Sequence, residues 1–107
     1  MPDPAEQLAH IYAAGFDVQT FERFPRAVGV IRDGIVALFE PASAGLKMIG
    51  TPGWRMGEVI AVLVEENGQK IFRYKEQRIE ATPERLEALA RFRHDLELLL
   101  DKRLSGE

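Results

Sequence analysis

The clearest pattern along the chain is a pair of apolar runs separated by Asp33-Gly34. The runs cover residues 27–32 and 35–40. Asp-Gly is typical of the type I′ turn of a β-hairpin, because both central residues of that turn need positive φ. Pairing around this turn gives two apolar faces, one with Ile31, Val36 and Leu38 and the other with Val28, Val30, Ile35 and Phe39. We therefore expect both faces to be covered, one by the C-terminal helix and the remaining one by the N-terminal helix or by contact with another subunit in a homodimer.

A second hairpin is predicted around Asn67-Gly68, with strands over residues 58–66 and 69–77. One face of this hairpin is apolar. The opposite face mixes apolar residues with Arg73 and Lys75, because side chains alternate along a strand. The second hairpin is therefore expected to have one core face and one face with a basic stripe.

A helix is predicted on each side of the two hairpins. The first, over residues 4–14, begins with a capping pattern of Asp3, Pro4 and Glu6 and carries the apolar stripe Leu8, Ile11 and Tyr12. The last, over residues 83–104, begins after Thr82. Its apolar residues fall on one arc, from which Leu98 points away: Leu86, Leu89, Phe92, Leu96, Leu99, Leu100 and Leu104. A helix of this length is about 33 Å long, so its last turns are expected to extend beyond strands of about 25 Å.

Two segments have weaker patterns. Residues 16–24 are aromatic-rich with imperfect alternation, which predicts an edge strand or an irregular extended segment. Residues 50–57 contain Gly50, Gly53, Gly57, a proline and the only tryptophan, Trp54. We interpret this segment as a long connection between the hairpins, with Trp54 packed on the rim of the core. The alternative is a ligand-binding loop.

Together these elements predict an α+β fold over residues 1–107 as a single domain. The expected sheet is antiparallel, has four or five strands made from the two hairpins, and is flanked by a short N-terminal helix and a long C-terminal helix. A chain of 107 residues suffices for one hydrophobic core.

The composition of the chain excludes several classes of function. The chain has no cysteine, which excludes disulfides, thiolate catalysis and cysteine-ligated metals. Its formal charge of −3 gives no general attraction for nucleic acid or anionic lipid. The longest apolar run covers only residues 59–64, and the N-terminal sequence lacks the pattern of a secretory signal. We therefore expect a cytoplasmic protein with no membrane or nucleic-acid partner.

Candidate catalytic and metal-binding groups are few. Ser43 lies outside a G-x-S-x-G pattern, so a nucleophilic serine is not indicated. His94, Asp95 and Glu97 offer too few ligands for a metal and are expected to be solvated. No catalytic residue, metal or cofactor is predicted.

Two functional hypotheses follow. The first is a non-enzymatic protein-interaction module that forms a homodimer through the leucine-rich helix, with possible further protein partners. Its interface residues would be Phe92, Leu96, Leu98, Leu99 and Leu104. The second is a small-ligand-binding domain or enzyme in which Trp54 and Arg55 of residues 50–57 hold an apolar or anionic group.

Overall fold

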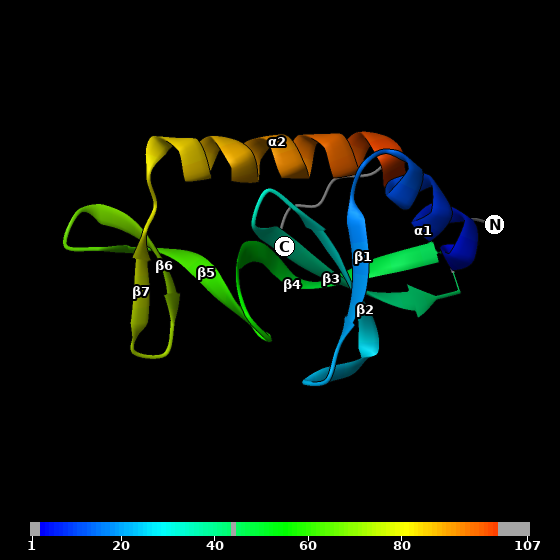
Figure 1. The fold of residues 1–107 in the computed structure, drawn as a ribbon, viewed down its shortest axis with the longest axis horizontal. Coiled ribbons are helices and arrows are strands. Elements are labelled where there is room, and N and C mark those ends of the chain that lie inside the picture. Colours follow the sequence, from blue (N-terminus) through cyan, green and yellow to red (C-terminus); the bar gives the residue numbers. More distant parts are fainter. Residues whose placement is uncertain (1–2, 44, 101–107) are drawn as a thin grey trace.

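A curled antiparallel sheet with one helix at each end forms the fold over residues 3–43 and 45–100, which the computed structural model describes (Figure 1). The elements follow in the order α1 (Pro4–Ala13), β1 (Asp17–Phe21), β2 (Phe24–Arg32), β3 (Ile35–Ala42), β4 (Gly45–Met56), β5 (Val59–Glu66), β6 (Gln69–Tyr74), β7 (Gln77–Glu80) and α2 (Pro83–Leu100). The α+β class is confirmed.

Each strand pairs with the next one along the chain. The described sheet therefore has seven strands in the order β1 to β7, all antiparallel. The expectation of four or five strands was wrong because β4 and β7 were not recognised, while β1 lies within the segment for which an edge strand was one of two interpretations. Strands β4 and β7 were missed for different reasons.

The two predicted hairpins are present with the expected turns. Asp33 and Gly34 have φ of 54° and 81°, and Asn67 and Gly68 have φ of 52° and 77°. In the first hairpin Ile31 lies opposite Val36, as the register predicts. The positive φ values show why this residue composition is required at both turns.

Strand β4 runs through the segment that was expected to be a loop. Its pairing with β3 shifts register between Val36 and Leu38, and this irregularity lets the strand continue past Pro52. Gly53 is required by close packing, since a Cβ there would lie 2.4 Å from the carbonyl oxygen of Ala61 on β5. The glycines and proline therefore mark a bulged strand rather than a connection.

Strand β7 begins where the second hairpin was expected to continue. Strand β6 ends at Tyr74, and Lys75 takes φ of 53° in a tight turn that brings Gln77 opposite Tyr74. Lysine seldom adopts this conformation. The sequence consequently gives no turn signal at this position.

The larger hydrophobic cluster lies between the sheet and both helices. Phe92 and Leu96 of α2 and Ile11 of α1 are fully buried in it together with Phe39 and Phe72 of the sheet. Figure 1 shows α2 lying along the sheet from the β7 end to the α1 end. This helix therefore ties both ends of the strand meander to one core.

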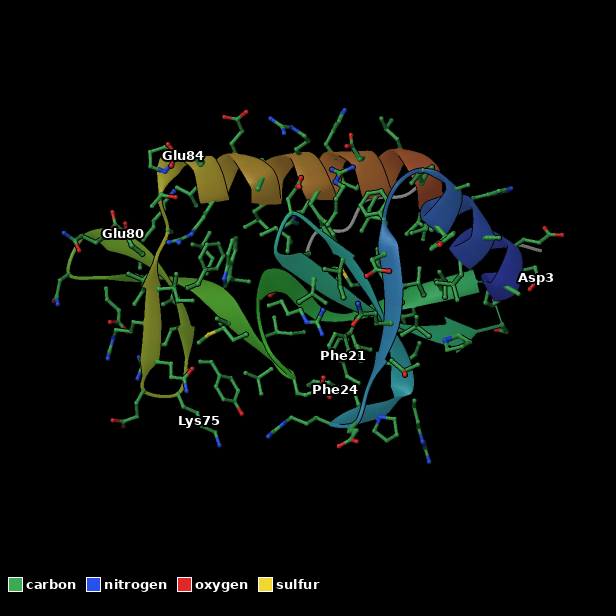
Figure 2. The ribbon with its side chains drawn as sticks, viewed as in Figure 1. Asp3, Phe21, Phe24, Lys75, Glu80 and Glu84 are labelled. Carbon is green, nitrogen blue, oxygen red and sulfur yellow. The ribbon has the colours of Figure 1, made fainter. Side chains whose placement is uncertain are left out.

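A second, smaller cluster lies on the opposite face of the sheet. It contains Phe21, Ala27, Ile31, Val36 and Leu38, with Phe24, Ile49 and Ile60 packed against it. The two-sided apolar character expected for the first hairpin is thus confirmed. The N-terminal helix, one of the two expected covers, does not lie there: the phenylalanines of the β1–β2 hairpin pack against this cluster, on the side away from α2 (Figure 2).

A contact between two turns holds this cover in place. The backbone N–H of Glu22, between β1 and β2, donates to Oε1 of Glu58, between β4 and β5, at 3.2 Å. The sheet therefore curls far enough for turns 36 residues apart in sequence to meet. The smaller cluster is therefore shielded by the β1–β2 hairpin of the same chain.

Both helices begin as predicted. Asp3 Oδ1 accepts a hydrogen bond from the Ala5 backbone N–H at 3.0 Å, and Thr82 Oγ1 accepts one from the Arg85 backbone N–H at 3.2 Å. The expected extension of α2 to Leu104 lies outside the described residues. Within those residues, neither helix has the length and apolar character needed to cross a membrane.

Candidate functional site

Trp54 is a packing residue on the rim of the larger cluster. It lies in β4 between Ile35 of β3 and Ala61 of β5. Its ring centroid is 5.9 Å from that of Phe72, and the guanidinium carbon of Arg85 lies 5.1 Å from the indole centroid. The indole therefore joins β4, β6 and the first turn of α2.

Arg55 points to the other face of the sheet. Its guanidinium carbon lies 5.1 Å from the Phe21 ring centroid, above the smaller cluster, and its Nε donates to the Gly57 carbonyl at 3.0 Å. Trp54 and Arg55 are adjacent in a strand, so their side chains diverge. The structure does not bring these two candidate ligand-binding residues together around one cavity.

The candidate interface residues of α2 separate into two groups. Phe92 and Leu96 have no exposed surface and pack in the core of the chain. Leu98 is 68% exposed and Leu99 is 37% exposed. Leu104 lies outside the described residues. The arc of leucines mainly serves the contact between α2 and the sheet.

A third exposed apolar side chain lies at the same end of the molecule. Tyr12 of α1 is 67% exposed, although its position in the predicted stripe suggested burial. Figure 1 shows α1 beside the C-terminal end of α2. We call Tyr12, Leu98 and Leu99 the helical-end patch. Of the large apolar side chains exposed in the described part of the chain, only Val62 lies outside it.

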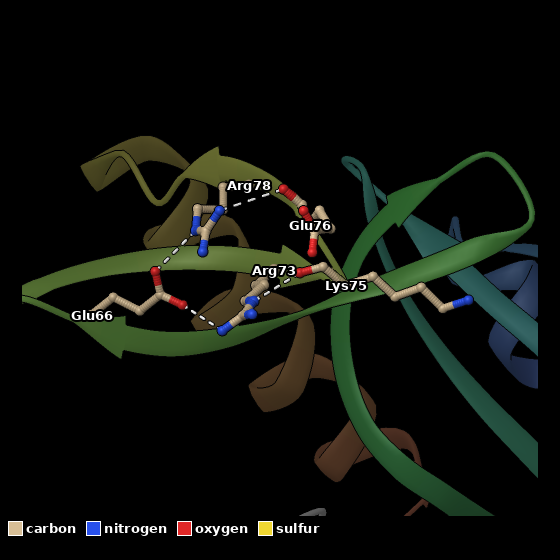
Figure 3. A network of polar contacts seen from close by, with 5 residues as sticks. All are labelled: Glu66, Arg73, Lys75, Glu76 and Arg78. Carbon is tan, nitrogen blue, oxygen red and sulfur yellow. Dashed lines mark hydrogen bonds and ion pairs between the residues drawn. The ribbon is translucent and has the colours of Figure 1, made fainter.

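Arg73 of the expected basic stripe on the second hairpin pairs with an acid from the neighbouring strand, and Lys75 lies over the Tyr74 ring. Glu66 Oε2 lies 2.7 Å from the Nη1 atom of Arg73, and Glu66 Oε1 lies 3.0 Å from the Nε atom of Arg78 (Figure 3). The hydrogen bond from Arg78 is the main reason that the pKa of Glu66 is lowered, with Arg73 acting in the same direction. Arg73 also donates to the Lys75 carbonyl at 2.8 Å. The two ion pairs of Glu66 therefore link β5 to β6 and to β7.

Arg32 connects the first hairpin to α2. Its Nη2 atom lies 2.8 Å from Asp95 Oδ2, and its guanidinium carbon lies 4.3 Å from the Phe16 ring centroid. Asp95 is thus part of a structural ion pair. Across residues 3–43 and 45–100, no three His, Cys, Asp or Glu side chains are grouped so as to hold a metal ion.

Comparisons with known proteins reveal no relative. No protein-family model, curated protein or solved structure matches this chain. Its function must therefore be inferred from its own surface. Among the described residues, no polar or charged side chain is buried, and the exposed apolar groups of the helical-end patch are the clearest departure from an ordinary solvated surface.

Proposed function

We propose that this protein is a non-enzymatic interaction module that self-associates through the helical-end patch. The observation that carries the proposal is the position of Leu98, 68% exposed on a helix whose other face is buried through Phe92, Leu96 and Leu100. The smaller exposure of Leu99 widens the apolar surface beside it. Burying such side chains against a partner is favourable, at about 25 cal/mol per Å² of apolar surface.

A second copy of the same chain is the partner that requires the fewest assumptions. In a two-fold symmetric contact the same patch serves both subunits, so Leu98 of one copy would pack near Leu98 of the other. Asp95, one turn earlier, is already paired with Arg32, which leaves less uncompensated charge beside the contact. Three large side chains form a small patch compared with interfaces of about 1,600 Å². We therefore expect a weak dimer, with a Kd in the micromolar range or above.

The ligand-binding or enzymatic alternative has less support. It requires Trp54 and Arg55 to act on one group, whereas the first contacts Phe72 and the second lies over Phe21 on the opposite face. Catalytic sites usually contain polar groups in buried surroundings, and the described residues include no buried polar or charged side chain. The helical-end patch consequently gives the better basis for a function.

The proposal is tested by Leu98→Glu, with Val62→Glu as the matched control. Both changes place one acid at an exposed apolar position, but Val62 lies in β5 opposite Arg73, away from the helical end. Sedimentation equilibrium is measured for the wild type and both variants from about 10 µM to about 1 mM. We expect association of the wild type and of Val62→Glu, and a monomer for Leu98→Glu.

Two results would overturn self-association at this patch. One is a wild-type protein that stays monomeric over the whole concentration range. The other is equal association of the wild type and Leu98→Glu. Circular dichroism of each variant verifies that the fold is retained, which is expected because the Leu98 side chain is mostly outside the core.

A further inference from the structure

A small surface cavity that is open to solvent lies beside the turn between β1 and β2, on the face of the sheet away from α2 (Figure 2). Its volume is about 260 Å³, and apolar groups dominate its lining. The lining residues are Phe24, Pro25, Ala27 and Ile49, with Arg23, Arg26 and Glu40. Figure 2 shows Phe24 on the side of the molecule opposite α2. The cavity therefore lies well apart from the helical-end patch.

The two arginines at this cavity differ from the other arginines of the structure. Arg23 and Arg26 are exposed, and the structure gives neither of them a hydrogen bond, an ion pair or a ring contact. Every other arginine within the described ranges makes a polar, ionic or ring interaction. Two unpaired guanidinium groups thus border one apolar cavity.

The acids near the turn do not neutralise these arginines. The carboxylate of Glu58 accepts the backbone N–H of Glu22, and neither glutamate forms an ion pair with Arg23 or Arg26 in the described part of the chain. Glu40 lines the cavity and lies in register opposite Lys47 of β4. An incoming carboxylate would therefore be favoured at the arginine rim and disfavoured beside Glu40, which can accept a backbone N–H instead.

We propose that this cavity binds an acidic peptide segment that carries one large apolar side chain. Guanidinium groups present paired N–H donors that match the geometry of a carboxylate. The cavity is smaller than the range of about 300–1,000 Å³ typical of small-molecule sites, and it suits a single aliphatic or aromatic side chain. The apolar side chain would enter against Phe24, Ala27 and Ile49, and flanking carboxylates would pair with Arg23 and Arg26.

This inference goes beyond self-association and does not depend on it. The proposed dimer uses Leu98 and its neighbours on the helices, whereas the peptide would bind at the β1–β2 turn on the other side of the sheet. A protein with both surfaces would present two peptide sites per dimer. The two experiments use different residues, so either proposal can fail without the other.

The test uses the full chain and short fluorescein-labelled peptides in which acidic residues flank one leucine, phenylalanine or tryptophan. Two control peptides replace the apolar residue by alanine or the acids by their amides. Anisotropy is followed to about 1 mM protein. We expect binding of the parent peptides, weakened at least about tenfold in both control peptides, because the apolar side chain and the charge both contribute.

Protein variants locate the binding. Arg23→Glu with Arg26→Glu should abolish it, while Arg23→Lys with Arg26→Lys should weaken it several-fold, because lysine keeps the charge but loses the paired donors. The control, Lys70→Glu with Lys75→Glu, makes the same change in net charge on the distant β5–β6–β7 region. Binding to this control should match the wild type.

Three outcomes would overturn the proposal. The first is no binding of any acidic peptide up to the highest concentration. The second is binding that the double Arg→Glu variant retains, or that the Lys70 and Lys75 control loses equally. The third is attachment to phosphatidylglycerol-containing vesicles without any peptide binding, which would make the turn a membrane contact. Circular dichroism and thermal melting verify that each variant is folded.

Discussion

The indole ring of Trp54 lies directly against Gly34, so the tip of the first hairpin is closed by a side chain from the neighbouring strand. A Cβ placed on Gly34 would be 2.7 Å from Cη2 of Trp54. The Gly34 carbonyl also accepts a hydrogen bond from the Arg55 backbone N–H at 2.8 Å. Gly34 thus has two roles: it adopts the positive φ of the turn, and it leaves room for the indole ring of Trp54 to pack against it.

These roles can be separated by comparing Gly34→Ala with Gly68→Ala. Both glycines are the second of the two central residues of a type I′ turn, with φ of 81° and 77°, but a Cβ on Gly68 would meet nothing within 4 Å. Each change should cost about 1–2 kcal/mol of unfolding free energy from left-handed strain. Gly34→Ala should cost a further amount of about 1–3 kcal/mol, because the indole must move. Urea unfolding followed by circular dichroism measures both, and equal losses would contradict the second role.

Gly29 and Phe21 form a second close pair. A Cβ on Gly29 would lie 2.1 Å from Cε2 of Phe21, whose ring covers the smaller cluster. Gly29→Ala should therefore destabilise the wild type by about 1–3 kcal/mol. In a Phe21→Leu background the same change should be nearly neutral, since the overlapping ring atom is gone. A double-mutant cycle from urea unfolding measures this coupling, and additive effects would show that the ring does not depend on Gly29.

The hairpins were predictable because Asp33-Gly34 and Asn67-Gly68 carry the turn chemistry in the residues themselves. Strand β4 was not predictable, because Pro52 and Gly53 are residue types typical of a loop. Glycine is required at position 53 because the backbone of Ala61, on another strand, leaves no room for a side chain. The β6–β7 turn was missed because Lys75 adopts a positive φ that its side chain does not favour. Tertiary packing accounts for the first case, whereas the second depends on a backbone conformation that the residue type does not reveal.

The candidate surfaces show the same division between local and tertiary information. The exposure of Leu98 followed from its angle on the helix, and the structure agrees. Phe92 and Leu96 were assigned to an interface because the sequence does not show how far a sheet extends beneath a helix. Arg23 and Arg26 were not singled out at all. Their lack of a partner depends on which residues the curled sheet brings near them, and no local pattern carries that information.

Arg32 and Asp95 should stabilise the attachment of α2 to the first hairpin. Their side chains are only 21% and 36% exposed, and Arg32 also lies over Phe16. We expect Asp95→Asn to cost about 1 kcal/mol of unfolding free energy and Arg32→Ala to cost more, because the ring contact is lost as well. The control is Arg91→Ala, which removes an exposed pair with Glu87 within the helix and should cost at most about 0.5 kcal/mol. Equal losses from Asp95→Asn and Arg91→Ala would contradict a special role for the Arg32 pair.

Glu66 should make the β5–β6–β7 region sensitive to acid. Arg78, through its hydrogen bond, and Arg73 lower the pKa of Glu66 from its usual value of 4.5. A carboxyl group whose pKa is lower in the folded protein stabilises the fold above its unfolded pKa and ceases to do so as the pH falls through the folded value. The wild type should therefore be more stable than Glu66→Gln at neutral pH, by an amount that is constant down to about pH 5.5 and shrinks below about pH 4.5.

Glu65→Gln is the matched control, because Glu65 precedes Glu66 in the same strand and makes neither of the two ion pairs. Unfolding by urea at a series of pH values measures the difference, and a wild-type advantage that persists undiminished into strong acid would rule out this origin.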